Sequence, residues 1–233
     1  MTEAPLPPAD PAQLWLRISH TDDLLDTPHA DALERWDVTV RHGRHVPGDA
    51  LGPGQATDAE VGAMTFYRVH VDRGQNAHRA LEEESDDLYE IAQAVLDPAT
   101  GNLTEAASES LEYVGTGLLI MDRVYLAPEW RGAGLGKALA VEAIRRLMPG
   151  ARAVVCTPGV TDLTGSALCD RAEWDRVTRK ITRGWEQLGF RHHQGDVYLL
   201  SPASLELEEQ CDEQRRHLAT LAVRWRAAHP EAG

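Results

Sequence analysis

Apolar and polar residues alternate along several stretches of the chain, and this alternation is typical of half-buried β-strands. It predicts strands over residues 13–19, 36–41 and 60–71. Between the last two, residues 46–57 are rich in glycine and proline, so we interpret them as a loop. Two strands are therefore expected to open the fold, and a longer one follows the loop.

Apolar residues spaced three and four apart predict one amphipathic helix over residues 78–96, which Asp97-Pro98 ends. An acidic run over residues 82–87 lies near its N-terminal half, where negative charge favours the helix dipole. We interpret this run as a solvated face, and attraction of a cationic substrate is the alternative. Residues 99–110 are small and polar and are expected to form a mobile connector.

The most strand-like segment of the chain covers residues 118–126. A predicted helix over 135–148 and a short apolar strand over 151–156 follow it. A strand, a helix and a strand in this order predict a βαβ unit, whose two strands run parallel. A further helix over 173–188 and a strand over 197–200 complete a mixed α/β arrangement.

Large apolar residues recur in a heptad-like seam along the tail of the chain, residues 204–229. The seam consists of Leu207, Cys211, Leu218, Leu221 and Trp225. Each large apolar side chain left in water would cost about 1.5–3 kcal/mol, so the seam must be covered. It can fold back on its own sheet or pair with a second copy about a two-fold axis, which is the commonest assembly of identical chains. Both alternatives stay open, and a homodimer is preferred.

Acidic residues outnumber basic ones, with 37 Asp and Glu against 23 Lys and Arg, which makes the formal net charge −14. Binding to nucleic acids and to anionic membranes depends on neutralising phosphates, so neither is an expected partner. A cationic partner or substrate fits this charge better. Among the basic residues only Lys137 and Lys180 are lysines.

No apolar run approaches the roughly 20 residues that a membrane span needs. The three cysteines include no Cys-x-x-Cys pair and form no disulfide framework, which indicates a reducing compartment. The histidine pairs His42/His45 and His192/His193 lack further ligands at a zinc-like spacing, so no metal site is expected. We therefore expect a soluble, cytoplasmic protein.

Three glycines at alternate positions, Gly132, Gly134 and Gly136, stand between the strand 118–126 and the helix that follows it. Glycines let backbone N–H groups turn inward without obstruction by a Cβ atom, and the helix N-terminus adds a partial positive charge. The segment therefore predicts a cradle for an anion.

Two phosphate-binding motifs do not fit this segment. A Walker A loop needs glycine at position 131 and serine or threonine at position 138, where Arg131 and Ala138 stand. A dinucleotide fingerprint needs its third glycine at position 137, where Lys137 stands. Neither a nucleoside triphosphatase nor a dinucleotide-binding enzyme is supported.

The run Arg131-Gly132-Ala133-Gly134-Leu135-Gly136 resembles the acyl-CoA signature of the Gcn5-related N-acetyltransferase (GNAT) superfamily. The later run of residues 184–190, GWEQLGF, is similar to the second motif of that family, and the resemblance covers about residues 111–201. It implies a GNAT-like α/β (α+β) fold with a mixed, mostly antiparallel sheet, a central splayed parallel strand pair and helices on both faces. The acyltransferase domain would cover 1–203, and 204–233 would form a C-terminal helical extension.

The resemblance also implies an N-acetyltransferase that moves an acetyl group from acetyl-CoA to an amine by direct attack. The acceptor would be a small molecule or a protein, and the acidic balance suggests a cationic amine. The pyrophosphate of acetyl-CoA would lie on the N–H groups of the cradle, with Arg131 supplying charge. Backbone N–H groups of Val124 and Leu126 would polarise the thioester carbonyl, as an oxyanion hole does. The implied cofactor-binding residues are Val124, Leu126, Arg131, Gly132, Gly134, Gly136 and Lys137.

One departure from the family pattern concerns the general acid. The tyrosine that protonates the leaving thiolate in many members falls at Trp185, which has no proton to give near neutral pH. Candidate replacements on neighbouring strands are Tyr125 and Asp122, with Tyr67 and His70 as further alternatives, and alternation does not decide which side chains face the cleft. The alternative function is a non-catalytic acyl-CoA-binding or protein-interaction module.

Overall fold

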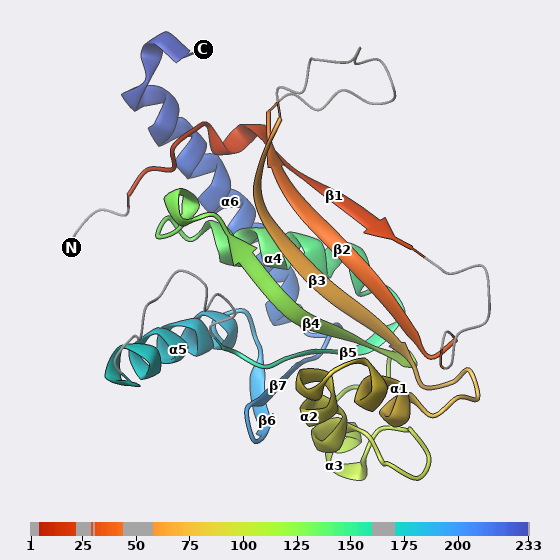
Figure 1. Cartoon of the computed structure of the whole chain (residues 1–233). Coiled ribbons are helices and arrows are strands. Elements are labelled where there is room, and N and C mark those ends of the chain that lie inside the picture. Colours follow the sequence, from red (N-terminus) through yellow and green to blue (C-terminus); the bar gives the residue numbers. More distant parts are fainter. Residues whose placement is uncertain (1–4, 22–28, 30, 44–57, 160–170, 233) are drawn as a thin grey trace.

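The predicted parallel strand pair lies within a seven-stranded mixed sheet of order β1-β2-β3-β4-β5-β7-β6 (Figure 1). The computed structural model describes residues 5–21, 29, 31–43, 58–159 and 171–232. β4 and β5 run parallel, and every other neighbouring pair of these strands is antiparallel. The strands are β1 (Leu14–His20), β2 (Leu33–His42), β3 (Ala59–His70), β4 (Gly117–Leu126), β5 (Ala151–Cys156), β6 (Arg191–Gln194) and β7 (Val197–Leu200).

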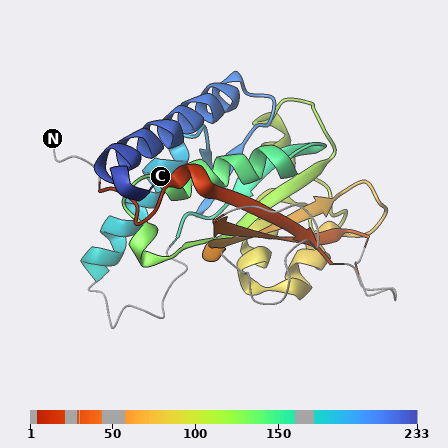
Figure 2. The ribbon, with the colours of Figure 1, turned by 90° about the horizontal axis from the view of Figure 1, so that it is seen from above.

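Helices cover both faces of this sheet. Figure 2 shows α6 and α4 on one side, with α6 lying over α4, and α1 and α2 on the other side. Phe66 and Leu119 of the sheet share one core cluster with Ile144 of α4, whereas Ile120 shares the other cluster with Leu88 of α2. The helices are α1 (Ala77–Glu84), α2 (Asp86–Val95), α3 (Glu105–Glu109), α4 (Leu135–Leu147), α5 (Arg171–Glu186) and α6 (Leu205–Ala228). The expected mixed, mostly antiparallel sheet with a central parallel strand pair and helices on both faces is confirmed.

The single helix predicted over 78–96 is wrong, because the chain breaks at Ser85. This residue is extended, with φ −166° and ψ 160°, and its hydroxyl accepts a hydrogen bond from the Leu88 N–H at 3.2 Å. Ser85 therefore ends α1 and caps α2, a role for which serine is well suited. Apolar spacing continues in register across the break, so the pattern alone does not reveal it.

The segment expected to be a mobile connector is instead structured. The Asp97 carboxylate accepts hydrogen bonds from the backbone N–H groups of Ala99 and Thr100, and Leu96 forms a β-bridge with Leu103. Thr104 then caps α3. Short polar side chains that bond to their own backbone order this segment without a hydrophobic pattern.

One strand of the sheet was not expected, and one predicted loop cannot be compared with the structure. Strand β6 was not predicted, because its sequence Arg-His-His-Gln has no alternation of apolar residues. It pairs with β7 across Gly195, which has φ +57°. The glycine- and proline-rich loop predicted over 46–57 falls outside the described residues.

The seam of the C-terminal helix is covered by its own chain. Leu207 and Leu221 are each 1% exposed and belong to the core that also contains α4. Arg215 of α6 pairs with Glu142 of α4 at 3.1 Å. The expectation of a homodimer rested on this seam and therefore loses its basis. No helix in the described residues is long and apolar enough to span a bilayer.

Leu221→Ala is expected to lower the free energy of unfolding by about 2–5 kcal/mol, because it leaves a cavity in the core that α6 covers. Val223→Ala is the matched control, since Val223 on the same helix is 65% exposed and should change stability by no more than about 0.5 kcal/mol. Urea denaturation measures both. An unfolding midpoint that rises with protein concentration in the wild type would instead indicate that α6 is covered by a second copy.

Candidate functional site

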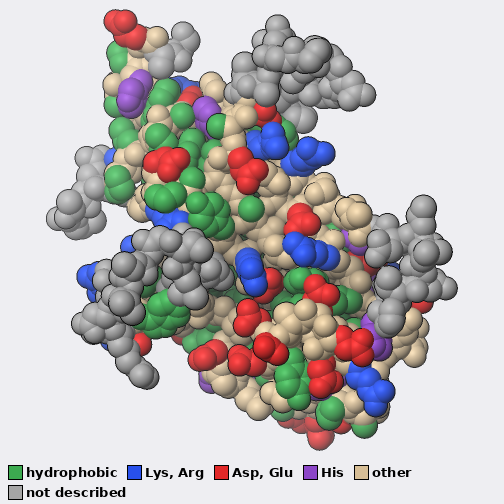
Figure 3. Space-filling model, viewed as in Figure 1, with side chains coloured by type: hydrophobic (Ala, Val, Ile, Leu, Met, Phe, Trp, Pro, Cys, Tyr) green, Lys and Arg blue, Asp and Glu red, His purple; other side chains and the backbone are tan. Residues whose placement is uncertain are grey.

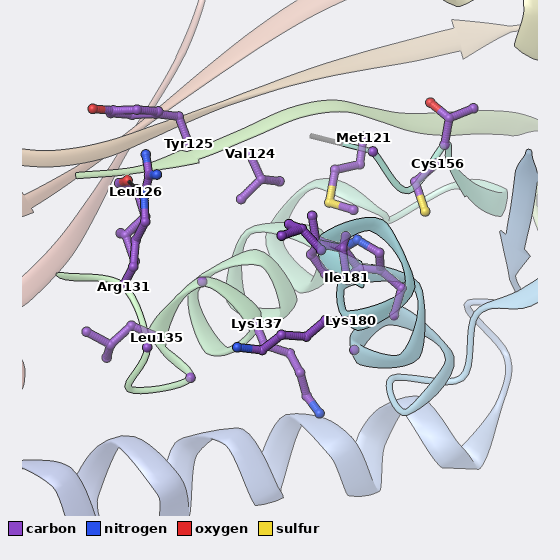
Figure 4. A pocket seen from close by; sticks show the side chains of 18 of the residues that line it. Met121, Val124, Tyr125, Leu126, Arg131, Leu135, Lys137, Cys156, Lys180 and Ile181 are labelled. Carbon is purple, nitrogen blue, oxygen red and sulfur yellow. Dashed lines mark hydrogen bonds between the residues drawn. The ribbon is translucent and has the colours of Figure 1, made fainter. Parts of the chain in front are cut away.

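A cavity of about 510 Å³ opens where β4 separates from β5, with the first turn of α4 and one side of α5 as its other walls (Figure 4). All nine residues predicted for the site line this cavity. They are Asp122, Val124, Tyr125, Leu126, Arg131, Gly132, Gly134, Gly136 and Lys137. The fold thus brings the strand end and the glycine-rich segment to one place.

The opening exists because the parallel pair stops before β4 ends. β4 and β5 are paired from Gly117 and Ala151 as far as Met121 and Cys156, whereas β4 continues to Leu126. Beyond Met121, the edge of β4 that would face β5 has no neighbouring strand among the described residues. Unpaired backbone groups at such an edge are available to a ligand that lies alongside it.

A bulge in β4 decides which side chains face the cavity. Met121 pairs with Phe66 and Arg123 pairs with Thr65, so Asp122 has no partner in β3. The extra residue shifts the alternation by one position. Val124 consequently packs on the same side as Met121, and Figure 4 shows Val124 and Tyr125 on opposite sides of the strand.

Backbone N–H groups of β4 point toward the opening at alternate residues. The Ala127 N–H donates to the Val61 carbonyl at 2.8 Å, on the β3 side. Because N–H groups along a strand point alternately to its two edges, those of Leu126 and Val124 face away from β3. Both therefore face the opening, and the Arg131 Nε reaches the Leu126 carbonyl from that side at 2.6 Å.

The glycine-rich segment leads into an uncapped helix. Gly132 and Gly134 have φ of +91° and +79°, a region that only glycine enters readily. No side chain caps α4, and its first turn contains no acidic residue. The first backbone N–H groups of a helix have no intrahelical partner, so those of residues 135–137 are available to an anion at the positive end of the helix dipole.

The three glycines are not equivalent. A Cβ atom on Gly134 would lie 2.8 Å from Nε2 of His217, a residue of α6. A Cβ atom on Gly136 would meet no atom within 4 Å. The missing side chain of Gly134 thus makes room for α6, and that of Gly136 leaves the space above the first turn of α4 open.

Three cationic side chains line the cavity. The Arg131 guanidinium lies 5.4 Å from the centre of the Tyr125 ring. Burial lowers the pKa of Lys137, whose Nζ donates to the Gln187 side chain at 3.1 Å. Lys180 forms no hydrogen bond or ion pair within the described part of the chain. Figure 4 shows Lys180 extending from α5 toward the first turn of α4.

Both lysines of the chain therefore line one cavity, although the sequence has a net charge of −14. Sequence reasoning noted how rare lysine is but did not assign Lys180 to the site. A helical pattern does carry a signal for it. Lys180 directly precedes the apolar Ile181, so it lies near the edge of the apolar face of α5, and that face meets the cavity.

Asp122 is a carboxylate at the point where β4 and β5 separate. Its side chain is 13% exposed, and its Oδ2 lies 3.4 Å from Nε of Arg123. Burial raises the pKa of Asp122, Arg123 opposes the rise, and the carboxylates of Asp87 and Glu84 add to it. The ionised form of Asp122 is thus less favoured than in water, which makes it a stronger base.

Two of the weighed alternatives lie away from the cavity. The Tyr67 hydroxyl donates to Glu84 of α1 at 3.0 Å, and burial raises the pKa of Tyr67. His70 pairs with Glu34 of β2 at 2.7 Å. Neither residue lines the cavity, so the idea that Tyr67 or His70 replaces the missing acid is not supported.

The remaining wall of the cavity is apolar. It contains Met121, Cys156, Val177, Ile181 and Trp185. Trp185 packs edge-on against Phe190 with ring centres 6.0 Å apart, as expected for a packing residue. Burial raises the pKa of the Cys156 thiol, so this cysteine is neutral and a poor nucleophile near neutral pH. The described residues hold no cluster of three or more His, Cys, Asp and Glu that could bind a metal.

Comparison with known proteins does not show a family for this chain. No protein-family model matches the chain, and no curated protein matches it. Solved structures that resemble it include a tyrosine-to-phenylalanine mutant of KacT, with 10% identity, 81% of this chain and 77% of that chain covered, and a TM-score of 0.36.

A KacTA–DNA complex has 10% identity, covers 88% of this chain and 99% of that chain, and has a TM-score of 0.34. AtaT complexed with acetyl-methionyl-tRNAfMet has 14% identity, covers 83% and 99%, and has a TM-score of 0.35. At these identities and TM-scores, the DNA and tRNA of those complexes say nothing about the ligands of this chain. That it has no nucleic-acid partner stays a prediction.

Replacing the two inner glycines by alanine should change stability in opposite directions. Gly134→Ala forces a residue with a side chain into φ +79° and against His217, and a left-handed conformation alone costs about 1–2 kcal/mol. Gly136→Ala adds a better helix former in open space and should stabilise α4 by up to about 1 kcal/mol. Chemical denaturation of the ligand-free protein measures both. Equal destabilisation by the two changes would contradict the distinct roles of these glycines.

Proposed function

We propose that the chain is an acyl-CoA-dependent N-acyltransferase that transfers an acetyl group to an amine. The observation that carries this proposal is the continuity of one cavity from the uncapped first turn of α4 to the unpaired edge of β4. A molecule that carries a pyrophosphate at one end and an extended amide-containing arm at the other matches both features. Coenzyme A has this form.

The phosphates would lie at the glycine-rich segment. Backbone N–H groups of Gly134, Gly136 and Lys137 would donate to them, and Arg131 would add a guanidinium. The ammonium of Lys180 would approach from α5 on the opposite side of the cavity. The chain as a whole is acidic, so these positive side chains offset its negative charge at the place where the phosphates would bind.

The pantetheine arm would lie along the edge of β4. Its amides can pair with the backbone as a neighbouring strand would, because the N–H groups of Val124 and Leu126 face the opening. The apolar side chains of Met121, Ile181 and Trp185 would exclude water from the arm. Placing an N–H group of this edge at the thioester carbonyl would stabilise the negative charge that develops there.

Acetyl-CoA would supply a thioester whose carbonyl carbon the amine attacks, so that a C–N bond forms and the C–S bond breaks. The leaving thiolate would gain one proton for the one that the amine loses, so that free thiol is released. Asp122 would take the proton that the amine loses, since its carboxylate stands at the end of the opening and its pKa is raised. Tyr125 is the weaker candidate because its ring lies against the Arg131 guanidinium, which is 5.4 Å from the ring centre.

A cationic amine is the acceptor class that the surface favours. Acidic side chains gather over α1 and α2 in Figure 3, and they include Glu82, Glu83, Asp86 and Asp87. The carboxylates of Asp87 and Glu84 act on Asp122, so the negative potential extends to the end of the cavity. This potential attracts ammonium groups and repels phosphates.

Gly136→Val is expected to weaken coenzyme A binding at least about tenfold, the effect of losing one hydrogen bond to a charged group. The added side chain would occupy the open space above the first turn of α4, which a phosphate needs. Isothermal titration calorimetry measures the affinity, and the melting temperature of the ligand-free variant is the control. Unchanged affinity in a folded Gly136→Val protein would remove the cradle from the proposal.

Asp122→Asn is expected to lower kcat about 100-fold or more while leaving coenzyme A affinity unchanged, since a general base contributes about 10²–10⁴ to the rate. In the wild type, kcat/KM should rise as pH increases through the raised pKa of Asp122, because the carboxylate is the active form. The Asn variant should lack this rise. Tyr125→Phe is the control and should stay near the wild-type rate. A large loss of kcat in Tyr125→Phe, with a near wild-type rate in Asp122→Asn, would instead assign the proton transfer to Tyr125.

Release of free thiol from acetyl-CoA, measured across a panel of amines, tests the reaction itself. Cationic polyamines and basic peptides should release thiol faster than neutral amines. Because Trp185 occupies the place of the usual acid, the alternative is a module that binds acyl-CoA without catalysis. Binding of coenzyme A with no thiol release for any amine would favour that alternative.

A further inference from the structure

The C-terminal helix α6 contacts the glycine-rich segment on the side away from the cavity. Nε2 of His217, in the middle of α6, lies 2.8 Å from the carbonyl oxygen of Ala133. A carbonyl oxygen only accepts hydrogen bonds, so the imidazole carries a proton on Nε2 and donates it. His217 itself does not line the cavity.

This hydrogen bond fixes the direction of a neighbouring N–H group. The Ala133 carbonyl and the Gly134 N–H belong to one planar trans peptide, in which they point in opposite directions. A carbonyl drawn toward α6 therefore turns the Gly134 N–H away from α6. Gly134 lines the cavity, whereas Ala133 is buried and does not.

The peptide needs such a restraint because glycine stands on both sides of Ala133. Gly132 and Gly134 have φ of +91° and +79°, and glycine adopts positive and negative φ with similar ease. The peptide between Ala133 and Gly134 could therefore rotate at little cost. Rotation would turn a carbonyl oxygen, which carries partial negative charge, toward the phosphates.

We propose that His217 is a positioning residue that locks the peptide between Ala133 and Gly134, so that its N–H group faces the acyl-CoA phosphates. This inference rests on the proposed function for the identity of the anion. The lock itself concerns the ligand-free chain. His217 acts through the backbone and does not touch the ligand.

The C-terminal helix is rigid enough for this role. Leu221, one turn beyond His217, is 1% exposed. Arg215 pairs with Glu142 of α4 at 3.1 Å, and Arg226 pairs with Asp10 near the N-terminus at 2.6 Å. These contacts hold α6 on both sides of His217. A helix outside both sequence motifs thus becomes part of the cradle.

Two substitutions of His217 separate the hydrogen bond from packing. Gln and Met have similar length and helix propensity, but only the Gln amide can donate to the Ala133 carbonyl. His217→Met should weaken coenzyme A binding at least about tenfold, and His217→Gln should retain most of the affinity. Arg216→Ala is the control on the same helix, because Arg216 is exposed and its guanidinium donates to the backbone carbonyl of Asp212.

The second readout needs no ligand. In ¹⁵N relaxation-dispersion NMR of the ligand-free protein, His217→Met should introduce exchange broadening at Ala133 and Gly134, whereas the wild type, His217→Gln and Arg216→Ala should show none. Equal coenzyme A affinity and equal exchange in the Met and Gln variants would overturn the lock. If the wild type failed to bind coenzyme A, the proposed function would fail, and the exchange measurement would still decide whether His217 holds the peptide.

Discussion

The early end of the pairing between β4 and β5 is the constraint on which the rest of the structure depends. Up to Met121 and Cys156 the two strands share a ladder, and beyond them β4 continues with an edge that faces the cavity. Backbone polar groups at such an edge need partners. The bulge at Asp122 occurs at the same point, so one local irregularity sets which side chains face the cavity and where its carboxylate stands. Every inference about the ligand arm follows from this geometry.

The glycine-rich segment adds the second half of the site, and its three glycines serve different purposes. Gly136 keeps the space over the first turn of α4 open, whereas Gly134 allows α6 to approach closely. A cradle of backbone amides binds an anion only if those amides point the same way before binding. We propose that His217 provides this order from a helix outside both the glycine-rich segment and residues 184–190.

Hydrophobic periodicity and motif spacing were enough to predict much of this fold. Strands β1, β2, β3, β4, β5 and β7, helices α4, α5 and α6 and the parallel pair were expected close to where they occur, because each carries a clear apolar pattern. Features set by single polar groups were missed: Ser85 divides a helix, and β6 has no apolar alternation. The orientation of Tyr125 could not be predicted either, because a bulge that changes the alternation leaves no signal in the composition of β4. The seam of α6 predicted burial but could not say which surface covers it.

The most direct test of the account follows backbone amides by NMR while coenzyme A is added. If the phosphates lie on the cradle and the arm lies along β4, the N–H signals of Val124, Leu126, Gly136 and Lys137 should shift and become protected from hydrogen exchange. The Tyr125 N–H, which faces β3, should change least along this strand. Protection at a different surface, with the signals of Val124 and Leu126 unchanged at saturation, would contradict the account.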